Sequence, residues 1–197
     1  KSIRASYTAR FRVHHGYKQK KYVWWKYRVL KNLVSSKPKE ISCINKKRNL
    51  KEVSYYFHTK SLKNFGIIHE IFYRNGVKKF PTEILPIFSD QMLAVWYMDD
   101  GSNNHGNVTL NTHSFSLEDQ KIIVDFLKEK YQIMPTIAKD RNQWKISIGR
   151  KDYNLFLSVI APFVPKAMSY KIDNPRIDLS TKSAERTKLF ANTSVPK

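Results

Sequence analysis

The chain has 197 residues, 41% of them hydrophobic, which is enough to bury a core in one domain or in two small ones. Its formal net charge of +20 is far more than solubility requires, so we expect a polyanionic partner. An anionic membrane surface is the alternative partner, but the basic residues are scattered and no apolar run is long enough to cross a bilayer. The single cysteine, Cys43, excludes an internal disulfide and fits a reducing compartment.

Residues 7–15 are predicted to form the first strand, because apolar and polar side chains alternate along them. Phe11 and Val13 belong to the face expected inside, and Arg10 and Arg12 to the outer face. Arginines on an outer sheet face suit the phosphates and guanine edges of nucleic acid, and plain solvation of that face is the alternative.

Residues 17–34 follow as a predicted amphipathic helix, which the Ser-Ser-Lys-Pro stretch at 35–38 ends. The expected buried stripe of this helix consists of Tyr22, Trp25, Val29 and Leu33. Residues 40–60 are predicted to form a hairpin with a basic tip, and residues 61–75 a second helix.

Residues 93–101, Leu-Ala-Val-Trp-Tyr-Met-Asp-Asp-Gly, form an apolar run that ends in two carboxylates and a glycine. The helical spacing of Leu93, Trp96, Tyr97 and Asp100 predicts a helix that stops at Gly101 and carries Asp100 at the end of its buried stripe. A carboxylate there is costly unless something binds it, although a core helix whose acidic end simply meets solvent has the same pattern. Asp99 points about 100° away from Asp100, so the two cannot aim at one site.

The order of the first 75 residues returns after Gly101, and it predicts a second set of elements. These are a strand at 107–115, a helix started by Ser116 and Asp119 as a capping box, strands at 136–139 and 144–148, and a last helix at 153–160. The chain is therefore an internal repeat of pattern: strand, helix, two strands and helix, twice.

Residues 93–101 resemble the LAGLIDADG motif of homing endonucleases, with Leu93, Ala94, Asp100 and Gly101 identical to it. The Trp-Tyr-Met-Asp-Asp-Gly form is most similar to the yeast mitochondrial intron endonucleases of the I-Sce type. The resemblance implies an α+β fold of two pseudo-symmetric αββαββα halves, whose saddle-shaped antiparallel sheets lie on DNA. Applied to this chain, it gives the following parts: 1–85 as a first half without its motif helix, 86–172 as a second half with one, and 173–197 as a basic C-terminal extension.

The first half of the pattern begins at the strand that should follow a motif helix. Three explanations stay open: the natural chain extends upstream and carries a first motif, that motif was lost, or the helix comes from another chain. We expect the first, because residues 1–15 match what should follow a motif. A monomer follows from that explanation, and a second chain is needed otherwise.

The resemblance also assigns roles in phosphodiester hydrolysis. Asp100 is expected to bind the catalytic metal, Mg²⁺ with Mn²⁺ as the alternative, and the carbonyl of Gly101 is a possible further ligand. Oxygen ligands and retained waters suit Mg²⁺, so one carboxylate per half can suffice. Lys79 and Lys171 match the family's lysines near the metal site in the two halves, where a cation stabilises charge on the phosphate.

DNA contacts are expected from the outward faces of the strands and from the hairpin tips. The predicted set is Arg10, Arg12, Lys46, Arg48, Asn111, Lys139, Arg141 and Lys145.

The function predicted is a site-specific, metal-dependent double-strand DNA endonuclease of the intron-homing type. The alternative is a non-catalytic binder of structured RNA on the same fold: an intron maturase, a splicing factor or a ribosome-associated protein. Both partners are polyphosphates, so charge fits both. The retained Asp100 favours the enzyme and the absent first motif favours the binder. By resemblance the expected location is an organelle, the mitochondrion before the chloroplast.

Overall fold

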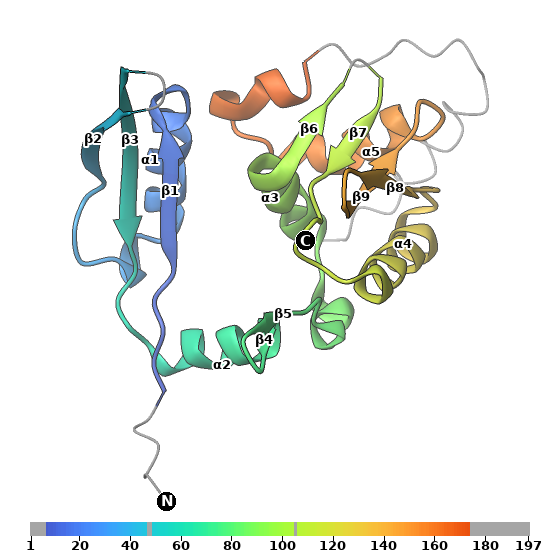
Figure 1. Ribbon diagram of the computed structural model, residues 1–197, viewed down its shortest axis with the longest axis horizontal. Helices are drawn as coiled ribbons and strands as arrows, with labels where there is room; N and C mark the ends of the chain where they lie inside the picture. The colour runs from blue at the N-terminus through green and yellow to red at the C-terminus, as the bar shows by residue number, and fades with distance from the viewer. Residues whose placement is uncertain (1–6, 47–48, 105, 174–197) are drawn as a thin grey trace, which may run out of the picture. The chain divides into compact units, whose positions relative to one another are not determined.

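The computed structural model describes residues 7–46, 49–104 and 106–173, and these belong to two compact units (Figure 1). The first unit runs to Asn75 and includes 165–168, and the second runs from Gly76 to Val164 and resumes at Ser169. Arg48 and almost all of the C-terminal extension lie outside the described residues. The three sequence parts 1–85, 86–172 and 173–197 stay a prediction.

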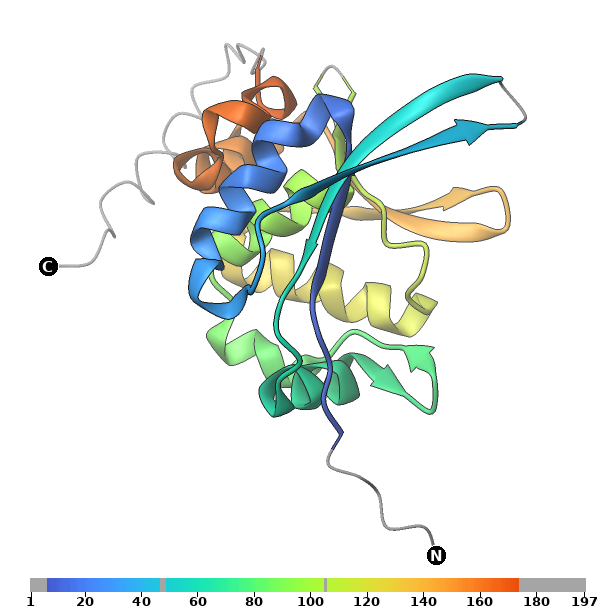
Figure 2. The ribbon, with the colours of Figure 1, turned by 90° about the vertical axis from the view of Figure 1, so that its left-hand side faces the viewer.

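The first unit is a three-stranded antiparallel sheet with one helix packed on it. Its elements are β1 (Arg12–Gly16), η1 (Tyr17–Gln19), α1 (Lys20–Val29), η2 (Lys31–Leu33), β2 (Lys39–Asn45), β3 (Leu50–His58) and α2 (Lys63–Phe72). The strand order is β1-β3-β2, and Figure 2 shows β1 beside β3 with the β2–β3 hairpin running on beyond it. Helix α1 covers the sheet face that carries Val13, Tyr55 and Phe57.

The observed ends of the elements in this unit, and the buried face of α1, correct the predicted side-chain positions. Phe11 is 46% exposed, because the regular strand begins one residue later, at Arg12. Val29 is 60% exposed, because α1 ends there and the chain turns into η2. The buried stripe instead includes Lys26, whose ammonium lies 4.5 Å from the centre of the Tyr22 ring.

Helix α2 is apolar along much of its length but is barely covered. Among its described residues Gly66 is buried, whereas Ile67 and Ile68 are 60% and 47% exposed. Helix α5 (Tyr153–Ile160) holds the same place in the second half of the repeat, and there the motif helix buries Phe156 and Ile160. Within the described residues no helix is long and apolar enough to span a membrane.

The second unit is a four-stranded antiparallel sheet with helices packed on one face. Its elements are β5 (Val77–Lys78), η3 (Thr82–Ile87), α3 (Asp90–Asp100), β6 (Gly101–Asn103), β7 (Val108–Leu110), α4 (Leu117–Tyr131), β8 (Thr136–Asp140), β9 (Gln143–Ile148), α5, η4 (Ala161–Phe163) and η5 (Lys166–Lys171). A short strand β4 (Tyr73–Arg74) pairs with β5 where the chain passes between the units. The sheet order is β6-β7-β9-β8. Ile146 and Ile148 of β9 and Ile123 and Leu127 of α4 are fully buried in one core.

Local signals in this half are confirmed with few changes. The Ser116 side chain accepts from the Asp119 backbone at 3.1 Å, and the Asp119 carboxylate accepts from the Ser116 backbone at 3.3 Å, as the capping box requires. The strand predicted at 107–115 is shorter, and the sequence pattern missed β6 altogether. A turn closed by the Asn104 amide on the Asn107 carbonyl, at 2.8 Å, joins the two short strands. Together the two units confirm an α+β fold with antiparallel sheets.

Candidate functional site

The motif helix α3 begins at a capped residue and ends at the two carboxylates. Ser89 accepts a hydrogen bond from the Met92 amide at 3.2 Å, which satisfies a donor of the first turn. Leu93, Ala94, Tyr97 and Met98 are completely buried. Helix formation here follows from this apolar surface, which packs against α5 and the sheet.

Asp100 is exposed, which corrects the expectation that it ends a buried stripe. The buried face of the helix instead includes Ala94 and Met98, and the side chain of Trp96 is only partly buried. The carboxylate of Asp100 is therefore hydrated and open to a cation from solvent. Its backbone carbonyl accepts from the Asn111 amide at 3.0 Å, which fixes the chain beside it.

Gly101 is required for space and not for a left-handed turn. Its φ of −91° is one that any residue adopts. A Cβ added there would collide with the Tyr97 ring and lie 2.6 Å from the Tyr97 carbonyl oxygen. Glycine thus lets the chain leave the helix directly into β6 while the Tyr97 ring stays packed under it.

Lys171 reaches the same place from 70 residues away. Its ammonium donates to the carbonyl oxygens of Met98 at 2.6 Å, Gly101 at 2.7 Å and Tyr97 at 3.3 Å. The structure therefore brings together Asp100, Gly101 and Lys171, three of the residues expected from the sequence.

Two polar residues complete this cluster, the fully buried Tyr97 and the partly buried Asn103, and the sequence predicted no site role for either. The Tyr97 hydroxyl donates to the Lys171 carbonyl at 2.7 Å, and the Asn103 amide donates to the same carbonyl at 3.1 Å and to the Tyr153 hydroxyl at 2.7 Å. Burial raises the pKa of Tyr97 far above its ordinary value, with Tyr153 adding to the shift, so the phenol stays a donor. No local pattern marks these residues, because each reads as an ordinary core or turn position.

The charge of Lys79 acts on Glu118, in the first turn of α4. The pKa of Glu118 there is lowered by the backbone and the Ser116 hydroxyl, and further by the charges of Lys121 and Lys79. Nothing in the described structure ties Lys79 to the carboxylate of Asp100, and its role stays a prediction.

The donor atoms at the end of α3 fit a hard divalent cation. The carboxylate oxygens of Asp100 are exposed, and hard cations prefer oxygen ligands and keep several waters. The carbonyl oxygen of Gly101 already accepts from the Lys171 ammonium at 2.7 Å, so only its second lone pair could join them. Within residues 7–46, 49–104 and 106–173, no group of three His, Cys, Asp or Glu side chains forms a ready-made metal cage. A cation here would thus need oxygens from other molecules as well.

The outer face of the first sheet, the face away from α1, gathers basic and aromatic side chains. Pairing of the strands places Arg12 beside His58, and it places Tyr56 between His14 of β1 and Lys39 of β2. The guanidinium of Arg12 lies 5.6 Å from the Tyr56 ring centre and 3.3 Å from His14 Nδ1. Arg10 and Lys46 are also exposed. Tyr56 and His58 were missed in the sequence, although they alternate with the buried Tyr55 and Phe57 along β3. Lys39, which pairs with Tyr56, was missed as well.

The second sheet is less basic on its outer face. Lys145 lies there, but its ammonium is 2.9 Å from the Asp140 carboxylate, which His113 also approaches at 3.3 Å. These two partners lower the pKa of Asp140, Lys145 being the larger cause. Lys139 pairs with Trp144 and so points to the other side of the hairpin, while Arg141 and Asn111 are exposed.

A pH dependence follows from His58. Burial lowers its pKa below 6.5, and the charges of Arg10 and Arg12 lower it further. Between pH 6.5 and this lower pKa the unfolded chain binds a proton that the folded one does not, so stability falls as pH drops through this window. We expect His58→Gln to flatten that part of the profile, measured as Tm from pH 5 to 8. An unchanged slope would contradict the assignment.

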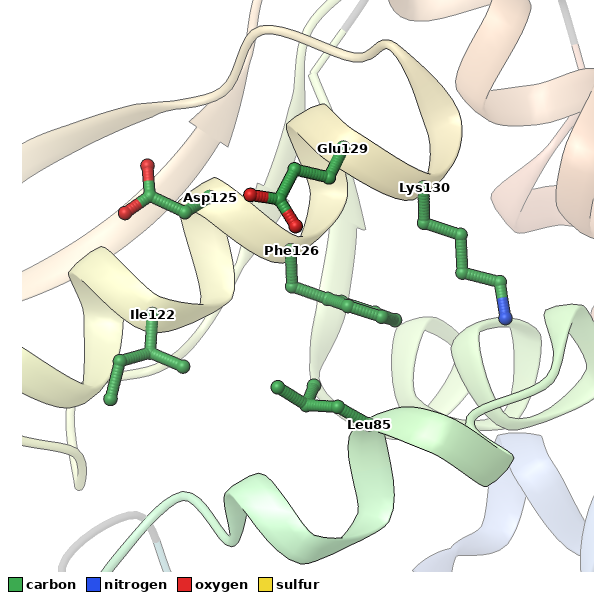
Figure 3. A pocket seen from close by; sticks show the side chains of 6 residues that line it. All are labelled: Leu85, Ile122, Asp125, Phe126, Glu129 and Lys130. Carbon is green, nitrogen blue, oxygen red and sulfur yellow. The ribbon is translucent and has the colours of Figure 1, made fainter.

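A hollow of about 540 Å³ lies between α4 and η3 in the second unit (Figure 3). Its apolar wall is formed by Leu85, Ile122 and Phe126, and Asp125 and Glu129 stand at its rim. Lys130 also lines it, so the lining carries two carboxylates and one ammonium and its net charge does not favour a polyanion. The outer sheet faces and the end of α3 are the candidate functional surfaces.

Comparisons with known proteins identify the family of the chain. Residues 1–156 match the model of the LAGLIDADG DNA endonuclease family. The probable intron-encoded DNA endonuclease 3 of Mycosarcoma maydis is 33% identical over 126 residues, covering 60% of this chain and 93% of that protein. The cytochrome b mRNA maturase bI2 of Debaryomyces hansenii is 30% identical over 120 residues, covering 60% of this chain and 46% of that protein.

The structure of the homing endonuclease I-WcaI bound to its DNA recognition sequence has the same fold. It superposes with a TM-score of 0.77 at 24% identity, covering 87% of this chain and 78% of that one. The family model spans well over half of the chain. The chain therefore belongs to the LAGLIDADG DNA endonuclease family.

Proposed function

We propose that this chain acts in a site-specific, divalent-metal-dependent double-strand DNA endonuclease of the intron-homing type. The observation that carries the proposal is the exposed Asp100 carboxylate at the end of the buried motif helix, beside backbone oxygens that suit a hard cation. The net charge of +20 and the DNA endonuclease relatives support DNA as the partner.

In this proposal Asp100 holds the cation, Mg²⁺ or Mn²⁺, together with the Gly101 carbonyl and phosphate oxygens of the DNA. The metal supplies Lewis-acid stabilisation of the phosphate and a more acidic bound water. The chain's own contribution is to present Asp100 on a rigid helix end, where buried side chains of α3 fix its direction. A second carboxylate, from a motif helix that the described part of the first unit does not contain, would complete the site.

Lys79 and Lys171 are proposed to act at the same centre. A lysine beside the scissile phosphate stabilises the charge that builds up there. We assign this direct role to Lys79, from its match to the family's segment, and treat Lys171 separately below.

The outer sheet faces would carry the DNA. A long recognition site is read by many modest contacts, each good bidentate base contact giving about 1–3 kcal/mol of discrimination. Lys139 is left out, because it points to the other side of its hairpin. The proposed contacts are Arg10, Arg12, Lys46, Arg48, Asn111, Arg141 and Lys145, and we add Lys39 and Tyr56, which pair on the first sheet. The enzyme would act as a monomer if a first motif precedes this chain, and in an organelle, as the cytochrome b maturase relatives suggest.

Arg12 and Arg28 provide a charge-matched test of the proposed surface. Both are exposed, but Arg28 lies on α1, which covers the opposite face of the sheet. Arg12→Gln should weaken DNA binding about 5-fold or more, because it removes a contact worth roughly 1–3 kcal/mol. Arg28→Gln should change the Kd less than about 3-fold, both measured by fluorescence anisotropy at one salt concentration. Equal losses would mean that only net charge matters.

The proposal itself is tested by selecting cleaved duplexes. The protein, with any upstream sequence its reading frame supplies, is incubated with a random-sequence double-stranded DNA library in Mg²⁺, and the newly cut ends are sequenced. We expect the cut molecules to converge on one long site. Random ends, or none, would overturn the proposal.

A second candidate function is that of an RNA-binding maturase. The maturase relatives favour it. Under this alternative the protein binds a structured intron RNA more tightly than any duplex DNA from the library, and Asp100→Asn leaves splicing unchanged.

A further inference from the structure

Residue 171 holds the end of the motif helix through both its side chain and its backbone. The ammonium donates to the carbonyls of Tyr97, Met98 and Gly101, and the Lys171 carbonyl accepts from Tyr97 and Asn103. These five hydrogen bonds, 2.6–3.3 Å long, join positions at least 68 residues apart in the chain. No other described lysine is tied to the backbone of α3 in this way.

The end of α3 needs such a cation. The last four carbonyls of a helix lack partners within it, and they form the negative end of its dipole. Asp99 and Asp100 add two carboxylates at the same end, which the dipole disfavours. A cation placed on the carbonyls offsets both effects and satisfies the oxygens.

The geometry also limits what else the ammonium can do. A lysine ammonium has three N–H donors, and three carbonyl oxygens lie within hydrogen-bonding distance of it. While these bonds persist, no donor remains for a phosphate oxygen. Lys171 is therefore placed to act on the backbone that carries Asp100, from the side of the helix end.

We propose that Lys171 is a positioning residue: it fixes the last turn of α3 and the Gly101 carbonyl, and so sets the direction of Asp100, without contacting the DNA. This proposal rests on the proposed function and differs from the direct electrostatic role that the sequence resemblance implies. Tyr97 and Asn103 belong to the same hydrogen-bond network, because they hold the Lys171 backbone against the helix end.

The test compares Lys171→Met with Lys166→Met, an exposed lysine of the same short helix. In metal-free buffer without DNA, Lys171→Met should lower Tm by about 4–8 °C, and Lys166→Met by less than about 2 °C. Well below both Tm values, Lys171→Met should slow single-turnover cleavage of the selected duplex at least 10-fold while the Kd for that duplex stays within 2-fold. Lys171→Arg, which can still donate to the carbonyls, should recover at least half of both losses.

Tyr97→Phe keeps the test available if Lys171→Met does not fold, because it removes one bond to the Lys171 carbonyl and leaves the ammonium in place. It should slow cleavage without changing the Kd. Lost cleavage with an unchanged metal-free Tm in Lys171→Met would overturn the proposal in favour of a direct role, and a lower Tm with unchanged cleavage would reduce the residue to a structural one. The Tm comparison needs neither metal nor DNA, so it stands even if the proposed endonuclease function fails.

Discussion

Asp100→Asn should abolish cleavage and leave DNA binding intact. The substitution keeps the size of the side chain and its exposed position, but it removes the negative charge that the proposed metal requires. Because loss of one preorganised charge interaction in an active site costs about 10²–10³-fold in rate, we expect at least a 100-fold fall in single-turnover cleavage. The Kd for the selected duplex should stay within about 3-fold, because most binding energy comes from the sheet faces.

Asp99→Asn is the matched control for this experiment. It removes the same charge one residue earlier, from a side chain that points about 100° away around the helix. Cleavage by this variant should stay within about 5-fold of the unmodified protein. If both variants lost cleavage equally, net charge at the helix end and not a particular ligand would be responsible.

Gly101→Ala should destabilise the second unit. The added Cβ would overlap the Tyr97 ring and lie 2.6 Å from the Tyr97 carbonyl oxygen, in a region where Tyr97 is fully buried. Overpacking of this kind costs typically about 1–3 kcal/mol. We expect a loss in that range in the free energy of urea unfolding, and weaker cleavage, because the ring and the Gly101 carbonyl must move.

Gly149→Ala provides the control for the backbone effect. Gly149 follows β9 in the same unit, and an added Cβ there meets nothing within 4 Å. Its unfolding free energy should change by less than about 0.5 kcal/mol. A similar change in the two variants would show that glycine matters at 101 for chain entropy and not for space.

Much of the fold was predictable because its signals are local. The capping box at Ser116, the motif helix from Ser89 to Asp100 and the two hairpins all follow from patterns within about ten residues. The exposures of Phe11 and Val29 were not predictable, since they depend on where a strand begins and a helix ends. Such boundaries are set by tertiary packing, which a periodic pattern does not encode.

The candidate site divides in the same way. Asp100 and Gly101 are visible as a motif, and Lys171 through its matching segment, but the hydrogen bonds among them join residues about 70 positions apart. The Lys145–Asp140 pair spans five residues across a turn and could have been expected from the hairpin itself. The roles of Asn103 and Tyr97 were not predictable, because a polar residue in a turn or in a buried stripe looks ordinary until its hydrogen-bond partner is known.

The most direct test of the account is to remove the metal from the protein bound to its selected duplex. Strand breaks are counted on a denaturing gel in Mg²⁺ and in excess chelator, with complex formation followed in parallel by gel shift. We predict breaks in both strands at one position in Mg²⁺, and an intact duplex that is still bound in chelator. Equal cleavage in both conditions, or a bound duplex that is never cut, would contradict the proposal that Asp100 serves a metal-dependent nuclease.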